Sequence, residues 1–121
     1  KEYLAELDAR NVRYHLQKDV RECIHNADVI YMEPVVQADY TKARIDAETA
    51  KKGLTPPEFK VTRELMRDKA KADSIILHSL PRMDELPLDV DSTRHSRMWI
   101  EAFNGVVLRM ALLALVLGKM E

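Results

Sequence analysis

The sequence has little of what several specialised classes of protein require. Cys23 is the only cysteine among 121 residues, so no internal disulfide can form, and a reducing, cytoplasmic setting fits best. The 19 basic and 20 acidic residues nearly cancel, and no basic block is interleaved with aromatics, which argues against a nucleic-acid partner. No secretory signal is recognisable, and the chain opens on Lys1 rather than methionine, which suggests a processed product or a piece of a longer protein.

Long apolar runs and cofactor motifs are also scarce. The longest apolar run, residues 106–117, is interrupted by Arg109 and is shorter than the roughly 20 residues that span a bilayer, so we expect no membrane partner. The sequence contains no glycine-rich phosphate loop, no metal-ligand spacing and no nucleophile elbow. We therefore expect neither a cofactor nor a metal ion.

What the sequence does contain is an alternation of helical and strand-like segments. Asp19 with Glu22 three residues later resembles a capping box, and Thr55 followed by Pro56 is typical of a helix start. The charged stretch 37–52 predicts an exposed loop with a weakly held helix. Apolar periodicity predicts helices near residues 3–10, 20–24, 56–70 and 96–119, the last one bent or interrupted at Asn104-Gly105, and strands at 12–16, 27–32 and 74–77.

This order of elements predicts an α/β fold, part of a doubly wound, Rossmann-like parallel sheet with a long C-terminal helix. We divide the chain into a partial α/β domain, residues 1–95, and the C-terminal helix, residues 96–121. In such sheets ligands bind beyond the carboxyl ends of the strands, here the loops 33–37 and 78–85. The four histidines are scattered and are expected to be structural, with His78 the strongest exception because it ends a strand.

The last predicted helix is apolar on nearly every face between residues 106 and 117. Such a helix must be covered on most sides, and three short strands with a few helices offer too little surface to do so. We expect a second domain or a partner subunit to cover the rest, so this helix should leave the chain's own core over part of its length. The alternative is the central core helix of a compact domain.

Three ordered motifs in the second half of the chain carry a resemblance. They are His78-Ser79-Leu80-Pro81-Arg82-Met83-Asp84-Glu85, then Asp89-Val90-Asp91, then Asn104-Gly105 with residues 109–117, and residues 27–32 extend the match. Together they resemble the carboxyl-terminal part of the amino-acid-binding domain of aspartate carbamoyltransferase, in the aspartate/ornithine carbamoyltransferase family. The His-x-Leu-Pro element fits the whole family, whereas the following Arg-Met-Asp-Glu and the terminal helix favour the aspartate branch.

The resemblance implies a role for the turn that follows the last predicted strand. In this family the Leu-Pro bond is cis, so Leu80-Pro81 is expected to be cis, which turns the carbonyls of Ser79 and Leu80 toward the reacting centre. There they would accept hydrogen bonds from the carbamoyl amide and from the attacking amine. The geometry needs Pro81, because a cis bond before any other residue costs about 2.5–4 kcal/mol.

Two further residues are implied as substrate-binding. Gln37 can be matched to the glutamine of the family's Thr-Arg-x-Gln motif. Arg82 either orients an anionic substrate or forms a loop ion pair with Asp84 or Glu85.

The chain departs from the family where an arginine usually holds a substrate carboxylate. Aspartate enzymes usually carry Thr-Arg-x-Gln after the Tyr-Met strand, whereas this chain has Glu33-Pro34-Val35-Val36-Gln37. Glu33 would repel the carboxylate that an arginine attracts. Recognition of aspartate then needs another cation, for which Lys42, Arg44 and Arg82 are the candidates.

The resemblance also implies partners. The family's Ser-Thr-Arg-Thr phosphate loop and catalytic histidine belong to an amino-terminal domain that this sequence does not contain. We therefore expect carbamoyl phosphate and an amino acid as substrates only when that domain is supplied, and a homotrimer whose active sites are shared between subunits.

Three functions remain open at this point. The first is a piece of an enzyme of pyrimidine biosynthesis, inactive alone, that moves a carbamoyl group to the amine of an amino acid, aspartate being the leading acceptor. The second is an inactive, carbamoyltransferase-like structural subunit. The third is a doubly wound module that binds a small ligand, which explains the order of elements but not the collinear motifs.

Overall fold

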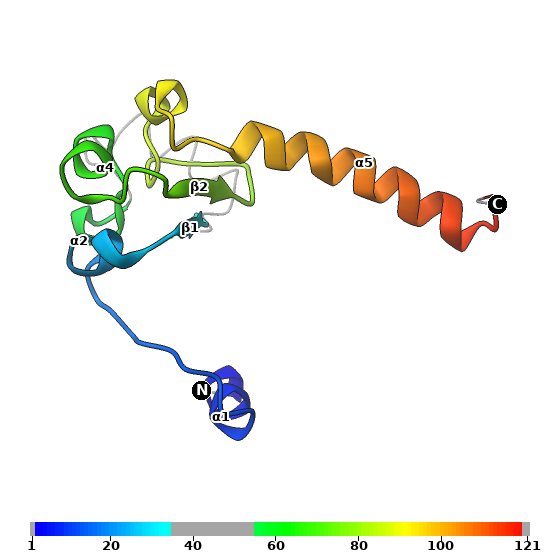
Figure 1. Ribbon diagram of the computed structural model, residues 1–121, viewed down its shortest axis with the longest axis horizontal. Helices are drawn as coiled ribbons and strands as arrows, with labels where there is room; N and C mark the ends of the chain where they lie inside the picture. The colour runs from blue at the N-terminus through cyan, green and yellow to red at the C-terminus, as the bar shows by residue number, and fades with distance from the viewer. Residues whose placement is uncertain (1, 35–54, 120–121) are drawn as a thin grey trace, which may run out of the picture.

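The computed structural model describes residues 2–34 and 55–119, so the loop expected at 37–52 lies outside the described residues. Figure 1 shows the two strands gathered with the short helices in one body, from which α5 projects, and an extended link joins that body to α1. The elements are α1 (Glu2–Ala9), α2 (Val20–Cys23), η1 (Ile24–Asn26), β1 (Val29–Met32), η2 (Pro57–Phe59), α4 (Arg63–Lys69), β2 (Ile75–His78), η3 (Leu88–Ser92) and α5 (Met98–Val116), where η denotes a 3-10 helix.

The two strands form a parallel pair, which confirms the predicted α/β class. Their register places Met32 opposite His78, so the carboxyl ends of both strands lie at one edge of the sheet. β2 is also paired on its other side, because Ile76 N–H donates to the carbonyl oxygen of His95 at 2.8 Å. β2 is therefore the inner strand of the described part of the sheet.

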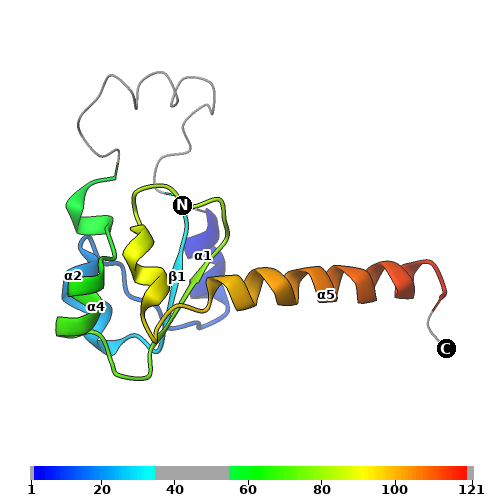
Figure 2. The same ribbon diagram turned by 90° about the horizontal axis from the view of Figure 1, so that it is seen from above.

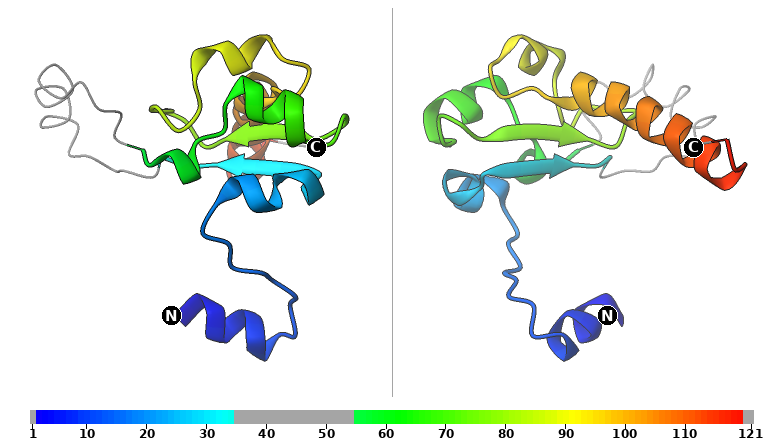
Figure 3. Two further views of the ribbon diagram at one scale, coloured as in Figure 1. Left: turned by 90° about the vertical axis from the view of Figure 1, so that its left-hand side faces the viewer. Right: turned by 45° about the vertical axis from the view of Figure 1, so that its right-hand side comes forward.

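The strand predicted at residues 12–16 is wrong. These residues belong to the extended link between α1 and α2, and Leu16 is 73% exposed. A strand needs a neighbouring strand for its backbone hydrogen bonds. Figures 1 and 3 show no other described element beside this link, so its apolar residues do not make it a strand.

One face of the sheet carries the core. On β2, Ile76 and His78 are buried, whereas Ile75 and Leu77 point to the opposite, half-covered face. The buried apolar side chains are Ile24, Ile30, Val61, Met66, Ile76, Leu86, Val90 and Met98. This core joins both strands to α4, to the segment around η3 and to the first residue of α5.

The single helix predicted over residues 56–70 is instead two elements, η2 and α4. Between them Val61 is 0% exposed, and its N–H donates to the carbonyl oxygen of Glu85 at 2.9 Å. Because Val61 is buried and its N–H bonds to Glu85 and not within a helix, η2 and α4 remain separate elements. Thr62 then caps α4 by accepting a hydrogen bond from Leu65 N–H at 3.2 Å, and Thr55 serves a different purpose described below.

Helix α5 leaves the body after its first turns, as predicted from its apolar faces. The helix is continuous through Asn104-Gly105, so the interruption predicted there does not occur. Met98 is its only buried residue, while Phe103 is 67% and Leu113 is 62% exposed. Figure 2 shows the projection along most of the helix, so the chain's own described residues do not cover it.

By length and composition alone, α5 would also pass as a membrane-spanning helix. One such helix is weak support for a membrane, because a core helix of a soluble protein passes the same test. The expectation of no membrane partner therefore stays a prediction.

Ile76→Ala should lower the free energy of unfolding of the full-length protein by about 2–5 kcal/mol, because it removes buried methyl groups and leaves a cavity. Ile76 is 0% exposed, whereas Leu88 is 76% exposed, so Leu88→Ala is the matched control. The control should change the free energy of unfolding by no more than about 0.5 kcal/mol. Urea denaturation followed by circular dichroism measures both, and equal effects would contradict the described core.

Candidate functional site

The carboxyl ends of β1 and β2 meet beside the first turns of α5 and form a pocket there. Its volume is about 320 Å³. The residues that line it are Tyr31, His78, Ser79, Leu80, Glu101, Ala102, Gly105 and Arg109. It lies where ligands bind in open parallel sheets, outside the carboxyl ends of the strands.

His78 is the buried anchor of this pocket. Leu80 N–H donates to His78 Nδ1 at 2.8 Å, so Nδ1 is an acceptor and the ring proton belongs to Nε2. Nε2 lies 2.8 Å from Glu85 Oε1 and donates to it, and Met83 N–H donates to the same oxygen at 2.7 Å. Both side chains are 0% exposed. The turn from 78 to 85 is therefore folded around two buried polar side chains.

The backbone of this turn has an unusual conformation. The Leu80-Pro81 bond is cis, as predicted, and Leu80 has a φ of 53°. A leucine rarely adopts this left-handed region, and such backbone persists where surrounding bonds hold it. The bond from Leu80 N–H to His78 is one of them. Ser79 and Leu80 line the pocket, whereas the use of their carbonyls by a substrate stays a prediction.

Glu101 links α5 to the end of β2. Its Oε2 accepts a hydrogen bond from His78 N–H at 3.0 Å. Tyr31 lies near the Glu101 carboxylate. The pKa of Tyr31 is raised, mainly by partial burial and next by the charge and hydrogen bonding of Glu101. The charge of Glu33 adds to this shift. The pocket therefore has negative charge where α5 meets the ends of the strands.

Arg82 points to a different partner from those predicted. It forms a two-pronged ion pair with Asp91, one arm of which measures 2.8 Å from Nη2 to Oδ2, rather than pairing with Asp84 or Glu85. Trp99 Nε1–H donates to the same carboxylate at 3.2 Å. The hydrogen bond from Arg82 holds the pKa of Asp91 below its usual value, and burial opposes that shift only in part.

Asp84, the expected partner of Arg82, belongs to a separate cluster. Its carboxylate accepts a hydrogen bond from the Thr55 hydroxyl at 2.6 Å and forms an ion pair with Lys60 Nζ at 2.8 Å. Burial alone would raise the pKa of Asp84, but the bonds from Lys60 and Thr55 outweigh it, and the pKa is lowered. Thr55 is thus a tether for the 78–85 turn instead of a helix cap.

The structure unites only part of the predicted site. Ser79 and Leu80 lie in the pocket, Pro81 follows them on the surface, and Arg82 is turned toward Asp91. Gln37, Lys42 and Arg44 lie outside the described residues.

Sequence reasoning missed three lining residues with polar or charged side chains. They are Tyr31, Glu101 and Arg109. Residues 101, 105 and 109 are four apart, so they share one helix face. Two charged residues on that face of an otherwise apolar helix were a signal that could have identified the pocket wall.

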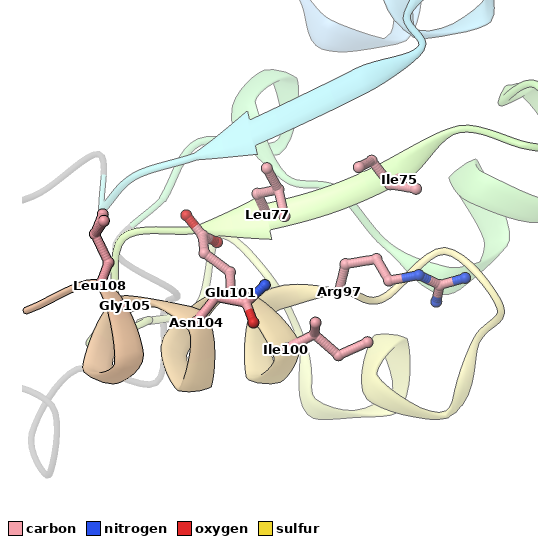
Figure 4. Close-up of a pocket in the computed structure, with 8 residues that line it drawn as sticks. All are labelled: Ile75, Leu77, Arg97, Ile100, Glu101, Asn104, Gly105 and Leu108. Carbon is pink, nitrogen blue, oxygen red and sulfur yellow. The ribbon is translucent and has the colours of Figure 1, made fainter. Parts of the chain in front are cut away.

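A second, larger pocket lies between β2 and the first turns of α5, as Figure 4 shows. Its volume is about 700 Å³. It is lined mainly by the half-covered sheet face and by apolar α5 residues: Ile75, Leu77, Arg97, Ile100, Glu101, Asn104, Gly105 and Leu108. Among the residues that the structure describes, no cluster of three or more His, Cys, Asp or Glu could hold a metal ion.

Comparison with known proteins agrees with this geometry. The family model described as Aspartate/ornithine carbamoyltransferase, Asp/Orn binding domain, matches residues 1–116. The chain belongs to this carbamoyltransferase family. It is 36% identical over 115 residues to the aspartate carbamoyltransferase catalytic subunit of Methanopyrus kandleri, covering 95% of this chain and 35% of that protein. With the corresponding subunit of Photobacterium profundum it shares 37% over 114 residues, 94% of this chain and 34% of that protein.

Solved structures of carbamoyltransferases resemble the fold as well. The catalytic subunit of M. jannaschii aspartate transcarbamoylase has a TM-score of 0.70 at 27% identity and covers 93% of this chain. The Trypanosoma cruzi enzyme in complex with carbamoyl aspartate and phosphate has a TM-score of 0.66 at 27% identity and covers 91% of this chain. This chain spans only 34% and 32% of those two chains, about a third of the length of its relatives.

Replacement of Glu85 should show how much the carbamoyltransferase turn depends on it. Glu85→Ala leaves the buried His78 Nε2–H without an acceptor, removes the acceptor of Met83 N–H, and should lower the free energy of unfolding by about 2–4 kcal/mol. Glu85→Gln keeps an oxygen acceptor and replaces Oε2, to which no described residue donates, so it should cost less than about 1 kcal/mol. Urea denaturation compares the two variants, and an alanine variant as stable as the glutamine variant would contradict the role of this bond.

Proposed function

We propose that this chain is the amino-acid-binding part of a carbamoyltransferase that moves the carbamoyl group of carbamoyl phosphate to the amine of an amino acid, a step of pyrimidine biosynthesis when the acceptor is aspartate. The observation that carries the proposal is the pocket lined by Ser79 and Leu80 at the joined strand ends, in a chain of this family. The related aspartate transcarbamoylase of T. cruzi has a solved structure in complex with carbamoyl phosphate and aspartate.

In the proposed reaction the amine nitrogen attacks the carbamoyl carbon, and the bond from that carbon to the phosphate oxygen breaks with its electron pair going to the leaving phosphate. The phosphate takes up the proton that the nitrogen releases. The carbonyls of Ser79 and Leu80 would accept hydrogen bonds from the carbamoyl amide and the amine and so hold the two nitrogens in place. Fixed orientation and preorganised dipoles supply most of the catalysis in such a reaction. The chain needs no cofactor for this role.

The rest of the machinery lies in other parts of the assembly. We propose an amino-terminal domain that binds carbamoyl phosphate, a homotrimer with shared active sites and a cytoplasmic location. Two observations support covering partners: α5 exposes apolar residues along its length, and the chain spans about a third of its relatives. A contiguous apolar surface of this kind marks an interface in a soluble protein.

Leu113→Glu tests whether α5 is covered in the full-length protein. Leucine and glutamate have similar helix propensities, so on a solvent-facing helix the change should be nearly neutral. Inside an interface it places a charge against apolar side chains and should reduce the trimer fraction at least about tenfold. Leu88→Glu, at a position 76% exposed on η3, is the control. Sedimentation velocity measures the trimer and urea denaturation the stability, and a Leu113 variant unchanged in both would sink the proposed coverage.

The acceptor is the finer part of the proposal. Glu33-Pro34 occupies the place of the arginine that the family uses for a substrate carboxylate, so unmodified protein should use aspartate poorly. A charge-assisted hydrogen bond is worth about 1.5–3 kcal/mol, so the double variant Glu33→Thr with Pro34→Arg should lower the KM for aspartate by about tenfold to a hundredfold. Steady-state carbamoyl transfer with aspartate, ornithine and other amino acids measures this. Efficient use of aspartate by the unmodified protein, unchanged in the variant, would contradict it.

The same assay, on the unmodified protein, also addresses the alternative of an inactive structural subunit, which Glu33-Pro34 favours. If the full-length protein transfers no carbamoyl group to any amino acid, and remains a trimer, the structural role replaces the catalytic one.

A further inference from the structure

One cation in the pocket at the strand ends has no role assigned to it by the resemblance. Arg109 lines the pocket together with Ser79 and Leu80, and none of the other lining residues is a lysine or arginine. Among the described residues, Arg109 takes part in none of the ion pairs. A guanidinium at a pocket wall, without a carboxylate partner in the described chain, is available to a ligand.

Helix geometry directs this side chain toward the strand ends. Side chains on a helix lean toward its N-terminus, so Arg109 leans back over Gly105, one turn earlier. A Cβ atom on Gly105 would lie 3.1 Å from Arg109 Nη1. The missing side chain at 105 therefore leaves the room that the guanidinium uses. Glu101 lies one further turn back, and its Oε2 accepts a hydrogen bond from His78 N–H at 3.0 Å.

The pocket carries charges of both signs. The Glu101 carboxylate reaches the end of β2, and Glu33 adds negative charge near Tyr31. Arg109, on the same face of α5 as Glu101, supplies the positive charge. A zwitterionic amino acid has its ammonium and carboxylate groups a few bonds apart, so it offers a partner to each sign. Its ammonium group is attracted to the acidic side chains and its carboxylate to Arg109.

We propose that Arg109 is a substrate-binding residue that holds a carboxylate of the amino-acid acceptor, with Gly105 as the position that leaves it room. The identity of the reaction rests on the proposed function, whereas the binding of an amino acid at Arg109 does not. A guanidinium holds a carboxylate through two parallel hydrogen bonds, so the contact fixes the acceptor's orientation as well as its position.

The test compares Arg109→Gln, Arg109→Lys and Gly105→Ala in the full-length protein, with Arg97→Gln as the control. Arg97 lies at the start of the same helix, and its guanidinium donates to the carbonyl oxygens of Arg94 and Ser96. Arg109→Gln should raise the KM for the acceptor by about tenfold to a hundredfold with the KM for carbamoyl phosphate unchanged. Arg109→Lys keeps the charge but loses the two parallel hydrogen bonds of the guanidinium, so it should raise the acceptor KM less than Arg109→Gln does. Gly105→Ala displaces the guanidinium slightly and should also raise the acceptor KM less than Arg109→Gln does.

Equilibrium dialysis with radiolabelled L-aspartate and L-ornithine separates this proposal from the proposed function. If the unmodified protein transfers no carbamoyl group, weaker binding of either amino acid to the Arg109→Gln variant still supports the proposal. An acceptor KM and amino-acid affinity equal to those of the Arg97→Gln control would overturn it. A change confined to carbamoyl phosphate would also overturn it, because the bound anion would then be the phosphoryl group. Should Arg109→Gln fail to fold, the Arg109→Lys and Gly105→Ala variants decide between the same outcomes.

Discussion

The hydrogen bond between the buried side chains of His78 and Glu85 is the contact on which the rest of the site depends. It fixes the imidazole so that Nδ1 can accept from Leu80 N–H, which holds Leu80 in its left-handed conformation. The backbone of the same histidine donates to Glu101, which ties α5 to the end of β2. One side-chain pair therefore positions the turn, the inner strand and the helix that together form the pocket.

A buried polar pair of this kind carries a cost as well as a benefit. Oε2 of Glu85 is buried without a described donor, and an unsatisfied buried polar atom is destabilising. The described chain nevertheless retains the pair, because two backbone or ring N–H groups converge on the other oxygen. An apolar pair would avoid the cost of the unsatisfied oxygen but would not fix the conformation of the turn. Buried polar pairs of this kind are expected beside functional sites.

The electrostatics of the pocket differ from what the turn motif alone implies. The turn matches the carbamoyltransferase family, yet Glu33 follows β1, and α5 supplies both the carboxylate of Glu101 and the cation of Arg109. Arg82, the basic residue of the motif, is paired with Asp91, whose carboxylate also accepts a hydrogen bond from Trp99 Nε1–H. The only lysine or arginine among the described residues that line this pocket therefore comes from the helix and not from the turn.

The sequence by itself determined the features that depend on neighbours a few residues apart. The Asp19 cap, the parallel α/β order, the cis bond at Leu80-Pro81 and the uncovered apolar helix all follow from local patterns or motifs. Only the tertiary structure decided that Thr55 binds Asp84, 29 residues away, and that residues 12–16 form no strand. It also decided that Tyr31, His78 and Arg109 meet in one pocket. Local periodicity reports which face of an element is apolar, but which polar groups meet across elements is set by packing and by the need to satisfy buried donors and acceptors.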